Sequence, residues 1–129
     1  IGVFHPPYIA LQAGATLRMK NGDALVFKGG SGEAERTPLK PVKMTYTRDG
    51  QANEIIAPAL LKRAELEEPD EELRLEDLKD IWNGEKEDEK ARSTIIGTAA
   101  AALFILQKAE TIEQAETIAK DYWQNRKPL

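Results

Sequence analysis

The feature that most constrains how this chain folds is an alanine-rich apolar segment between Ser93 and Ala109. When the segment is drawn as a helix, apolar side chains surround it nearly completely instead of forming one stripe. A helix with this pattern has to be covered on several sides, so we predict that it is central and buried. The apolar stretches of the chain are all well short of a membrane span, and we expect no association with a membrane.

Two shorter helices are predicted, one before and one after this segment. The residues from Lys62 to Lys90 are mostly charged, but they contain a small apolar stripe at helical spacing that ends at Asn83-Gly84. The stripe consists of Leu75, Leu78, Ile81 and Trp82. Thr111 to Gln114 matches a capping box and begins a final helix through Trp123. The inward face of that helix is expected to hold Ile112, Ala115, Ile118 and Ala119.

The first part of the chain contains short apolar runs of strand length. Ile1 to Phe4 and Ala24 to Phe27 enclose a helical pattern from Tyr8 to Lys20. Two strands joined by a helix within so few residues predict a parallel βαβ unit.

A β-hairpin is predicted next. Val42 to Thr47 alternates in polarity, with Val42, Met44 and Tyr46 on one face. Residues 48–51 have turn character, and Ala52 to Ala57 is the expected return strand. The predicted fold class is therefore α/β: a βαβ unit, a β-hairpin and then helices.

The composition narrows the class of protein. The chain has 129 residues, 41% of them hydrophobic and 31% charged, which is enough to bury one core in a globular domain. It has no cysteine, which excludes disulfides, thiolate zinc sites and cysteine nucleophiles and fits a cytoplasmic protein. The sequence begins at Ile1, inside a run typical of the end of a buried strand, so we expect it to be a fragment of a longer protein.

A glycine-rich run after the second strand is the candidate phosphate site. It consists of Lys28, Gly29, Gly30, Ser31 and Gly32. Glycines let backbone N–H groups approach an anion, although the spacing matches neither G-x-x-x-x-G-K-[ST] nor G-x-G-x-x-G. The alternative is a plain turn between two strands.

Two carboxylates follow this run. Glu33 and Glu35 are candidate ligands for Mg²⁺, which takes oxygen donors and bridges phosphates. The alternative is that both are solvated loop residues. His5, the only histidine, lies between a predicted strand and two prolines. It is either a site residue at the edge of the sheet or a hydrogen-bonded structural histidine.

The charge is unevenly distributed. The whole chain carries a net charge of −4, but the stretch from Arg18 to Arg48 has seven basic and three acidic residues, roughly +4 by subtraction. A local positive excess can bind phosphate groups by releasing their counterions. The candidate contacts with a nucleic-acid backbone are Arg18, Lys20, Lys28, Arg36, Lys40 and Lys43.

Several segments of the chain, taken in order, resemble the C-terminal half of anthranilate phosphoribosyltransferases. Gly2 to Pro6 resembles the family's Gly-Val-Tyr-His-Pro strand end. Leu25 to Glu35 resembles the strand and loop that read Val-Val-His-Gly, two variable residues, then Gly-Leu-Asp-Glu. Trp82 to Glu85 is similar to a Leu-x-Gly-Glu helix end. Ala91 to Leu103 and Thr111 to Ala119 resemble the family's alanine-rich buried helix and its last helix.

The resemblance implies that residues 1–129 are the C-terminal portion of a glycosyl transferase family 3 α/β domain with a phosphoribosyltransferase-like fold. Family members transfer a phosphoribosyl group from phosphoribosyl pyrophosphate with the help of Mg²⁺, and we expect a homodimer at full length. The family's Gly-Thr-Gly-Gly-Asp and Lys-His-Gly-Asn segments do not occur in this sequence. The chain alone is therefore expected to be inactive.

The departures from the family pattern point to its divergent paralogous branch. Ala34-Glu35 stands where the family has a metal-binding Asp-Glu pair, so the resemblance carries over Glu35 alone as a metal ligand. Lys28 replaces a histidine, and Thr98 stands where asparagine is usual. Some members of that branch bind nucleic acid rather than anthranilate. Three functions stay open: phosphoribosyl transfer related to tryptophan biosynthesis, sequence-independent nucleic-acid binding, and a structural half that completes a core or a dimer.

Overall fold

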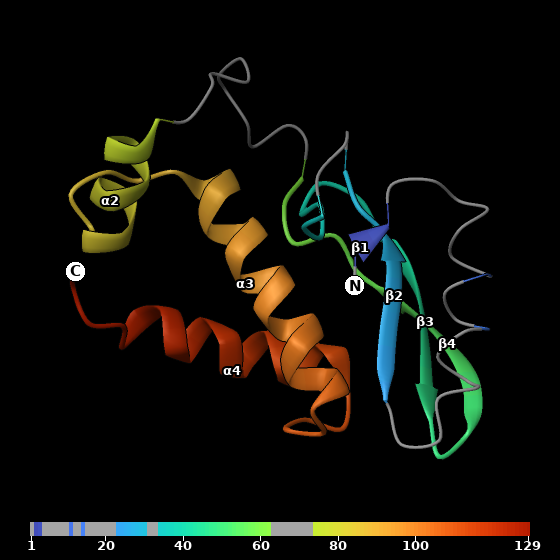
Figure 1. Ribbon diagram of the computed structural model, residues 1–129. Helices are drawn as coiled ribbons and strands as arrows, with labels where there is room; N and C mark the ends of the chain where they lie inside the picture. Colours follow the sequence, from blue (N-terminus) through green and yellow to red (C-terminus); the bar gives the residue numbers. More distant parts are fainter. Residues whose placement is uncertain (1, 4–10, 12–13, 15–22, 31–33, 63–73) are drawn as a thin grey trace.

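The computed structural model describes residues 2–3, 11, 14, 23–30, 34–62 and 74–129. These residues form a mixed α/β structure, which confirms the predicted class, and all the described helices lie on the same side of the sheet (Figure 1). The sheet has the order β1 (Gly2–Val3), β2 (Ala24–Lys28), β3 (Val42–Arg48), β4 (Gln51–Ala57). The helices are α2 (Leu75–Asn83), α3 (Glu89–Ile105) and α4 (Ile112–Gln124).

The sheet combines both kinds of pairing. β1 and β2 are parallel, as the sequence predicts, whereas β2 with β3 and β3 with β4 are antiparallel. The helix predicted from Tyr8 to Lys20 lies outside the described residues, apart from Leu11 and Gly14. A parallel pair needs a crossover connection, whereas an antiparallel pair can be joined by a tight turn.

The β3–β4 hairpin is confirmed. Its turn consists of Asp49 and Gly50, whose φ angles are +51° and +74°. Two left-handed residues in a row make the turn that best fits the twist of a two-residue hairpin, and Asp-Gly is a preferred pair for it. Val42 and Met44 are buried on the predicted inner face, and Tyr46 is half-buried with its ring edge-on to Phe104.

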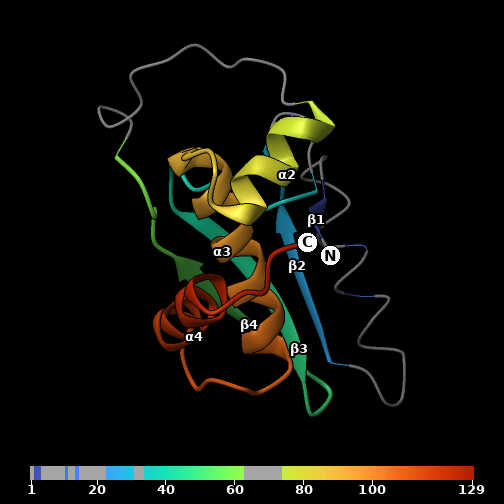
Figure 2. The same ribbon diagram turned by 90° about the vertical axis from the view of Figure 1, so that its left-hand side faces the viewer.

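The core lies between the sheet and the layer formed by α3 and α4, which Figure 2 shows in front of the strands. Apolar side chains from both layers meet there, and burying each of the larger ones (Val, Leu, Ile, Phe or Met) stabilises the fold by about 1.5–3 kcal/mol. The sheet contributes Leu25, Phe27, Val42 and Met44, α3 contributes Ile96, Ala100, Ala101 and Phe104, and α4 contributes Ile112, Ala115 and Ala119.

The prediction that α3 is buried all round is wrong. Its face toward the sheet and α4 is buried, but Ile95 is 38% exposed and Ala102 is also exposed. With the sheet on one side and α4 on another, the two neighbours do not enclose the whole circumference. The helix also begins earlier than predicted, at Glu89, because the Asp88 carboxylate accepts a hydrogen bond from the Ala91 N–H at 2.7 Å and caps it.

The predicted cap of α4 is confirmed. Thr111 Oγ1 accepts from the Gln114 N–H at 3.2 Å, and Gln114 Oε1 accepts from the Glu110 N–H at 3.0 Å. The glutamine therefore reaches one residue further back than in the usual capping box. Ile112, Ala115 and Ala119 are buried as predicted, and Ile118 is half-buried.

α2 follows its predicted pattern and ends at Gly84, which has a left-handed φ of +82°. Only the C-terminal end of its apolar stripe is covered: Ile81 is buried, whereas Leu75 is 63% exposed. Arg126, just beyond α4, fastens this end. Its guanidinium donates to the backbone oxygens of Ile81, Trp82 and Trp123 and lies 3.8 Å from the centre of the Trp123 ring.

Candidate functional site

The carboxyl ends of β1 and β2 lie side by side at one edge of the sheet. The parallel register places Val3 opposite Lys28, so both chains leave the sheet at the same edge. Ligands of open α/β sheets bind outside such carboxyl ends. Lys28 is exposed there, Gly29 is buried and Gly30 is half-buried.

Several of the sequence-predicted site residues lie outside the described residues. They are His5, Arg18, Lys20, Ser31, Gly32 and Glu33. The described part of the predicted phosphate loop therefore consists of Lys28, Gly29 and Gly30. The structure keeps these three residues at the end of β2, where the sequence predicts them.

Glu35 is exposed and has no hydrogen-bond or ion-pair partner among the described residues. No group of three Asp, Glu or His side chains that could hold a metal ion occurs in the part of the chain that the structure describes. Mg²⁺ is commonly held by one or two carboxylates together with substrate phosphates, and it keeps several waters. One exposed carboxylate suits an ion that arrives with a phosphate ligand better than a resident ion in a protein cage.

The prediction that Arg36 contacts nucleic acid is wrong. Its side chain is completely buried, with 0% of its surface exposed. Nη1 donates to Glu116 Oε1 at 2.7 Å, and Nη2 donates to the backbone oxygen of Pro58. The Arg36 N–H donates to Thr98 Oγ1 at 3.1 Å. A guanidinium held inside the protein cannot reach a phosphate on the surface, so this residue ties the loop after the glycine-rich run to α3, α4 and the end of β4.

Helix α3 packs closely against this ion pair at Gly97. Gly97 on α3 lies directly against it, because a Cβ atom there would meet Leu60 Cδ1 at 2.9 Å and Arg36 Cδ at 3.4 Å. The absence of a side chain at this position lets α3 pack on the arginine stem. Sequence reasoning missed Glu116, but a signal existed: it lies one residue after Ala115 and three before Ala119, on the inward face of α4.

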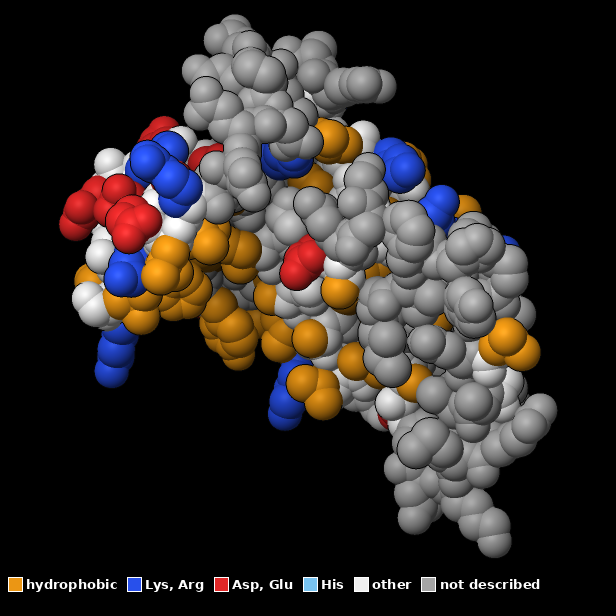
Figure 3. Space-filling model, turned by 45° about the horizontal axis from the view of Figure 1, so that its top comes forward, with side chains coloured by type: hydrophobic (Ala, Val, Ile, Leu, Met, Phe, Trp, Pro, Cys, Tyr) orange, Lys and Arg blue, Asp and Glu red, His pale blue; other side chains and the backbone are white. Residues whose placement is uncertain are grey.

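The other basic candidates do not form a ready-made patch. Lys43 Nζ is 2.7 Å from Glu54 Oε1, which offsets its charge, and Lys40 is exposed. On the visible face in Figure 3 the Lys and Arg side chains of the described residues are dispersed, while hydrophobic side chains gather over the helical half. Among the described residues, Lys28 and Lys40 are therefore the predicted contacts that stay exposed without a carboxylate beside them.

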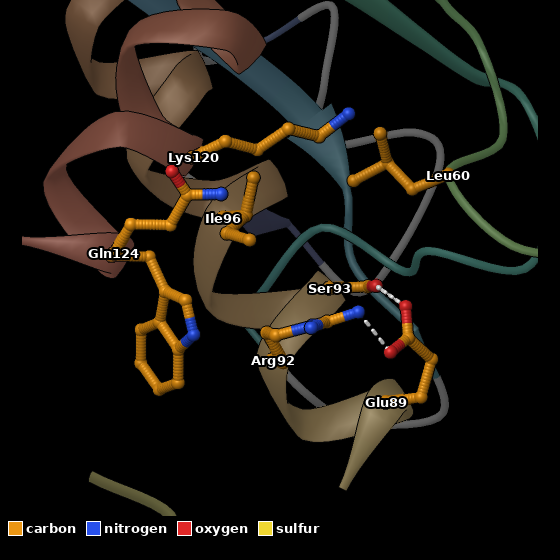
Figure 4. Close-up of a pocket in the computed structure, with 8 residues that line it drawn as sticks. Leu60, Glu89, Arg92, Ser93, Ile96, Lys120 and Gln124 are labelled. Carbon is orange, nitrogen blue, oxygen red and sulfur yellow. Dashed lines mark hydrogen bonds and ion pairs between the residues drawn. The ribbon is translucent and has the colours of Figure 1, made fainter. Parts of the chain in front are cut away.

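A pocket of about 240 Å³ lies between the first half of α3 and the second half of α4 (Figure 4). Its walls combine the polar side chains of Glu89, Arg92, Ser93, Lys120 and Gln124 with the apolar ones of Leu60, Ile96 and Trp123. Arg92 donates to Glu89 Oε2, and Ser93 Oγ lies 3.5 Å from Glu89 Oε1. The pocket could not be predicted from the sequence, because polar residues at helical spacing are ordinary on a surface.

No family model matches the chain, and no curated protein matches its sequence. The resemblance to anthranilate phosphoribosyltransferases therefore stays a prediction. None of the helices in the described ranges is long and apolar enough to cross a membrane.

Proposed function

We propose that this chain is part of a phosphoribosyltransferase-like protein, in which the β1–β2 edge of the sheet binds the phosphate groups of phosphoribosyl pyrophosphate. The observation that carries the proposal is the parallel register of Val3 with Lys28. It brings two carboxyl strand ends together beside an exposed ammonium group and two glycines, which is the arrangement that phosphate binding needs.

In this proposal each residue has a limited role. Lys28 Nζ neutralises charge on the phosphates, and the backbone N–H groups at Gly29 and Gly30 approach them closely because no Cβ stands in the way. Glu35 supplies one oxygen ligand to the Mg²⁺ that accompanies the diphosphate and offsets its negative charge. Arg36 positions Glu35 by fixing the adjacent backbone in the interior.

The binding part of the proposal is tested on the chain itself by amide NMR during a titration with Mg²⁺ and pyrophosphate. We expect saturable shifts centred on Lys28, Gly29 and Gly30, and a weaker affinity in Lys28→Ala. The matched control is Lys79→Ala, which removes an exposed lysine from α2, away from this edge. Shifts spread over the surface, or equal affinities of both variants and the unchanged chain, would contradict the proposal.

The catalytic part is tested on the intact protein by following the consumption of phosphoribosyl pyrophosphate with aromatic acceptors. We expect Glu35→Gln to abolish turnover and Glu87→Gln, at another exposed glutamate, to leave it unchanged. We expect no turnover from the 129 residues alone. Full turnover by Glu35→Gln would remove the role given to Glu35.

We do not advance sequence-independent nucleic-acid binding as a second function. Of the basic residues on which that prediction rests, Arg36 is inside the protein and Lys43 is paired with Glu54. The positive excess at the surface is smaller than the sequence count indicates.

A further inference from the structure

The pocket between α3 and α4 is separate from the proposed phosphate site and has charged walls of its own. It lies on the helical layer, and its walls belong to α3, α4 and the segment after β4 rather than to the edge formed by β1 and β2. The carboxylate of Glu89 is already engaged by Arg92 and Ser93. Lys120 has no hydrogen-bond or ion-pair partner among the described residues.

The side chain of Lys120 points into the pocket. Figure 4 shows its side chain reaching from α4 across the pocket toward Leu60, with Ile96 and the amide of Gln124 beside it and the Arg92–Glu89 pair on the far side. The walls thus carry two cations and one anion, and the anion is neutralised by a neighbour. An incoming anion would meet the Lys120 ammonium beside Leu60, with the aliphatic carbons of Ile96 next to it.

We propose that this pocket binds a small carboxylate with a short aliphatic body. Lys120 pairs with the carboxylate beside Leu60, and the aliphatic chain of the ligand packs on Ile96 and Trp123. The size supports a small ligand, because pockets for drug-sized molecules are usually 300–1,000 Å³ and this one is about 240 Å³. A single negative charge fits better than the double charge of a phosphate monoester, because Lys120 is the one cation of these walls without a carboxylate partner among the described residues.

The test is a titration of the chain with hexanoate, followed by amide and indole NMR signals. We expect saturable shifts concentrated at Leu60, Ser93, Ile96 and the Trp123 indole. Hexan-1-ol has the same aliphatic body without the charge. We expect its affinity to be about tenfold lower than that of hexanoate, because one charge-assisted hydrogen bond is lost. Hexylamine, with the opposite charge, should not bind.

Variants separate the pocket from unspecific adsorption. We expect Lys120→Met to weaken hexanoate binding about tenfold and Lys120→Arg to retain it, while hexan-1-ol binding stays unchanged in both. Lys79→Met is the matched control, since it removes an exposed helical lysine elsewhere and should have no effect. Unchanged melting temperatures establish that the variants fold.

Three outcomes would overturn this inference. They are equal affinities for hexanoate and hexan-1-ol, equal loss in Lys79→Met and Lys120→Met, or shifts centred on Lys28 to Gly30 instead of the pocket. Inorganic phosphate distinguishes the two sites: it should shift the signals at Lys28 to Gly30 if the proposed function holds, whereas the pocket inference requires only that hexanoate shift the α3–α4 signals. Each idea can therefore fail without the other.

Discussion

Arg36 and Glu116 lie 80 residues apart in the sequence and form an ion pair of 2.7 Å inside the protein. The arginine side chain is fully buried and that of the glutamate is 9% exposed. Removing two charges from water is costly, and the ion pair and the hydrogen bond to Pro58 offset part of this cost, although the Arg36 Nε is buried without a hydrogen-bond partner among the described residues. The loop that begins after β2 is thereby fixed to the last helix.

Breaking this pair should be strongly destabilising. We expect Arg36→Met to lower the free energy of unfolding by about 3–5 kcal/mol, because it leaves the Glu116 carboxylate buried without a partner. The double variant Arg36→Met/Glu116→Leu should lose less than the single variant, since no buried charge is left. Urea denaturation measures both.

The control is an exposed ion pair with the same distance between its nitrogen and oxygen atoms. Lys43 and Glu54 are also 2.7 Å apart, but both side chains are more than half exposed. We expect Lys43→Met to change the free energy of unfolding by less than about 1 kcal/mol. If Arg36→Met lowered the free energy of unfolding no more than Lys43→Met does, burial would not determine the strength of the Arg36–Glu116 pair.

The pKa of Asp77 should be displaced. The hydrogen bond from the Lys86 ammonium at 2.8 Å, helped by the backbone N–H of Arg74, lowers the pKa of this carboxyl from 3.8 to about 2. A folded pKa below the unfolded one means that the carboxylate stabilises the fold above the unfolded pKa, and that this contribution is lost as the pH falls from about 4 to about 2. We expect Lys86→Met to raise the pKa.

Carboxyl ¹³C NMR over this pH range measures the titration of Asp77 directly. Lys79→Met is the control for removing a positive charge from the same region of the chain, and it should leave the titration near its original position. A midpoint near 4 in the unchanged protein would show that the Lys86 contact does not persist in solution.

The hairpin turn should depend on Gly50. Alanine at a φ of +74° brings its Cβ close to the backbone, and we expect Gly50→Ala to lower the free energy of unfolding by about 1–2 kcal/mol. Asp49→Asn should be nearly neutral, because asparagine also accepts the left-handed conformation. Thermal denaturation of the two variants, side by side, checks this; equal stability of both would contradict the turn geometry.

The attachment of α2 should depend on Arg126. Its guanidinium binds three backbone oxygens at the ends of α2 and α4, and we expect Arg126→Met to lower the local stability of α2 by about 2 kcal/mol while the sheet is unaffected. Hydrogen exchange of the α2 amides measures this. Lys127→Met is the control, since Lys127 contributes its backbone oxygen to Trp82 and its side chain is exposed. Equal exchange in both variants would show that Arg126 does not hold α2.

Local signals explain which parts of the fold follow from the sequence. The hairpin turn at Asp49-Gly50, the stop of α2 at Gly84 and the cap at Thr111 are each determined by a few neighbouring residues, and each is confirmed. The exposure of Ile95 could not be predicted in the same way. The hydrophobic pattern of α3 shows how much of the helix surface is apolar. How much of that surface is buried depends on the elements that pack against it in the tertiary structure.

The candidate site shows the same division. Lys28 and its glycines were predicted from their place after a strand, and they lie at the expected edge of the sheet. Arg36 was predicted to contact nucleic acid because it belongs to the basic stretch from Arg18 to Arg48. Its partner, Glu116, belongs to a helix 80 residues further on, and no local pattern links the two.

The distance along the chain between these two residues also has a consequence in time. A ribosome adds about 5–20 residues per second, so the guanidinium of Arg36 emerges about 4–16 seconds before the carboxylate that neutralises it. The β3–β4 hairpin is local and can form within that interval. Since a lone buried charge is costly, we expect the interior beside Gly97 to close only after α4 has brought the Glu116 carboxylate to Arg36.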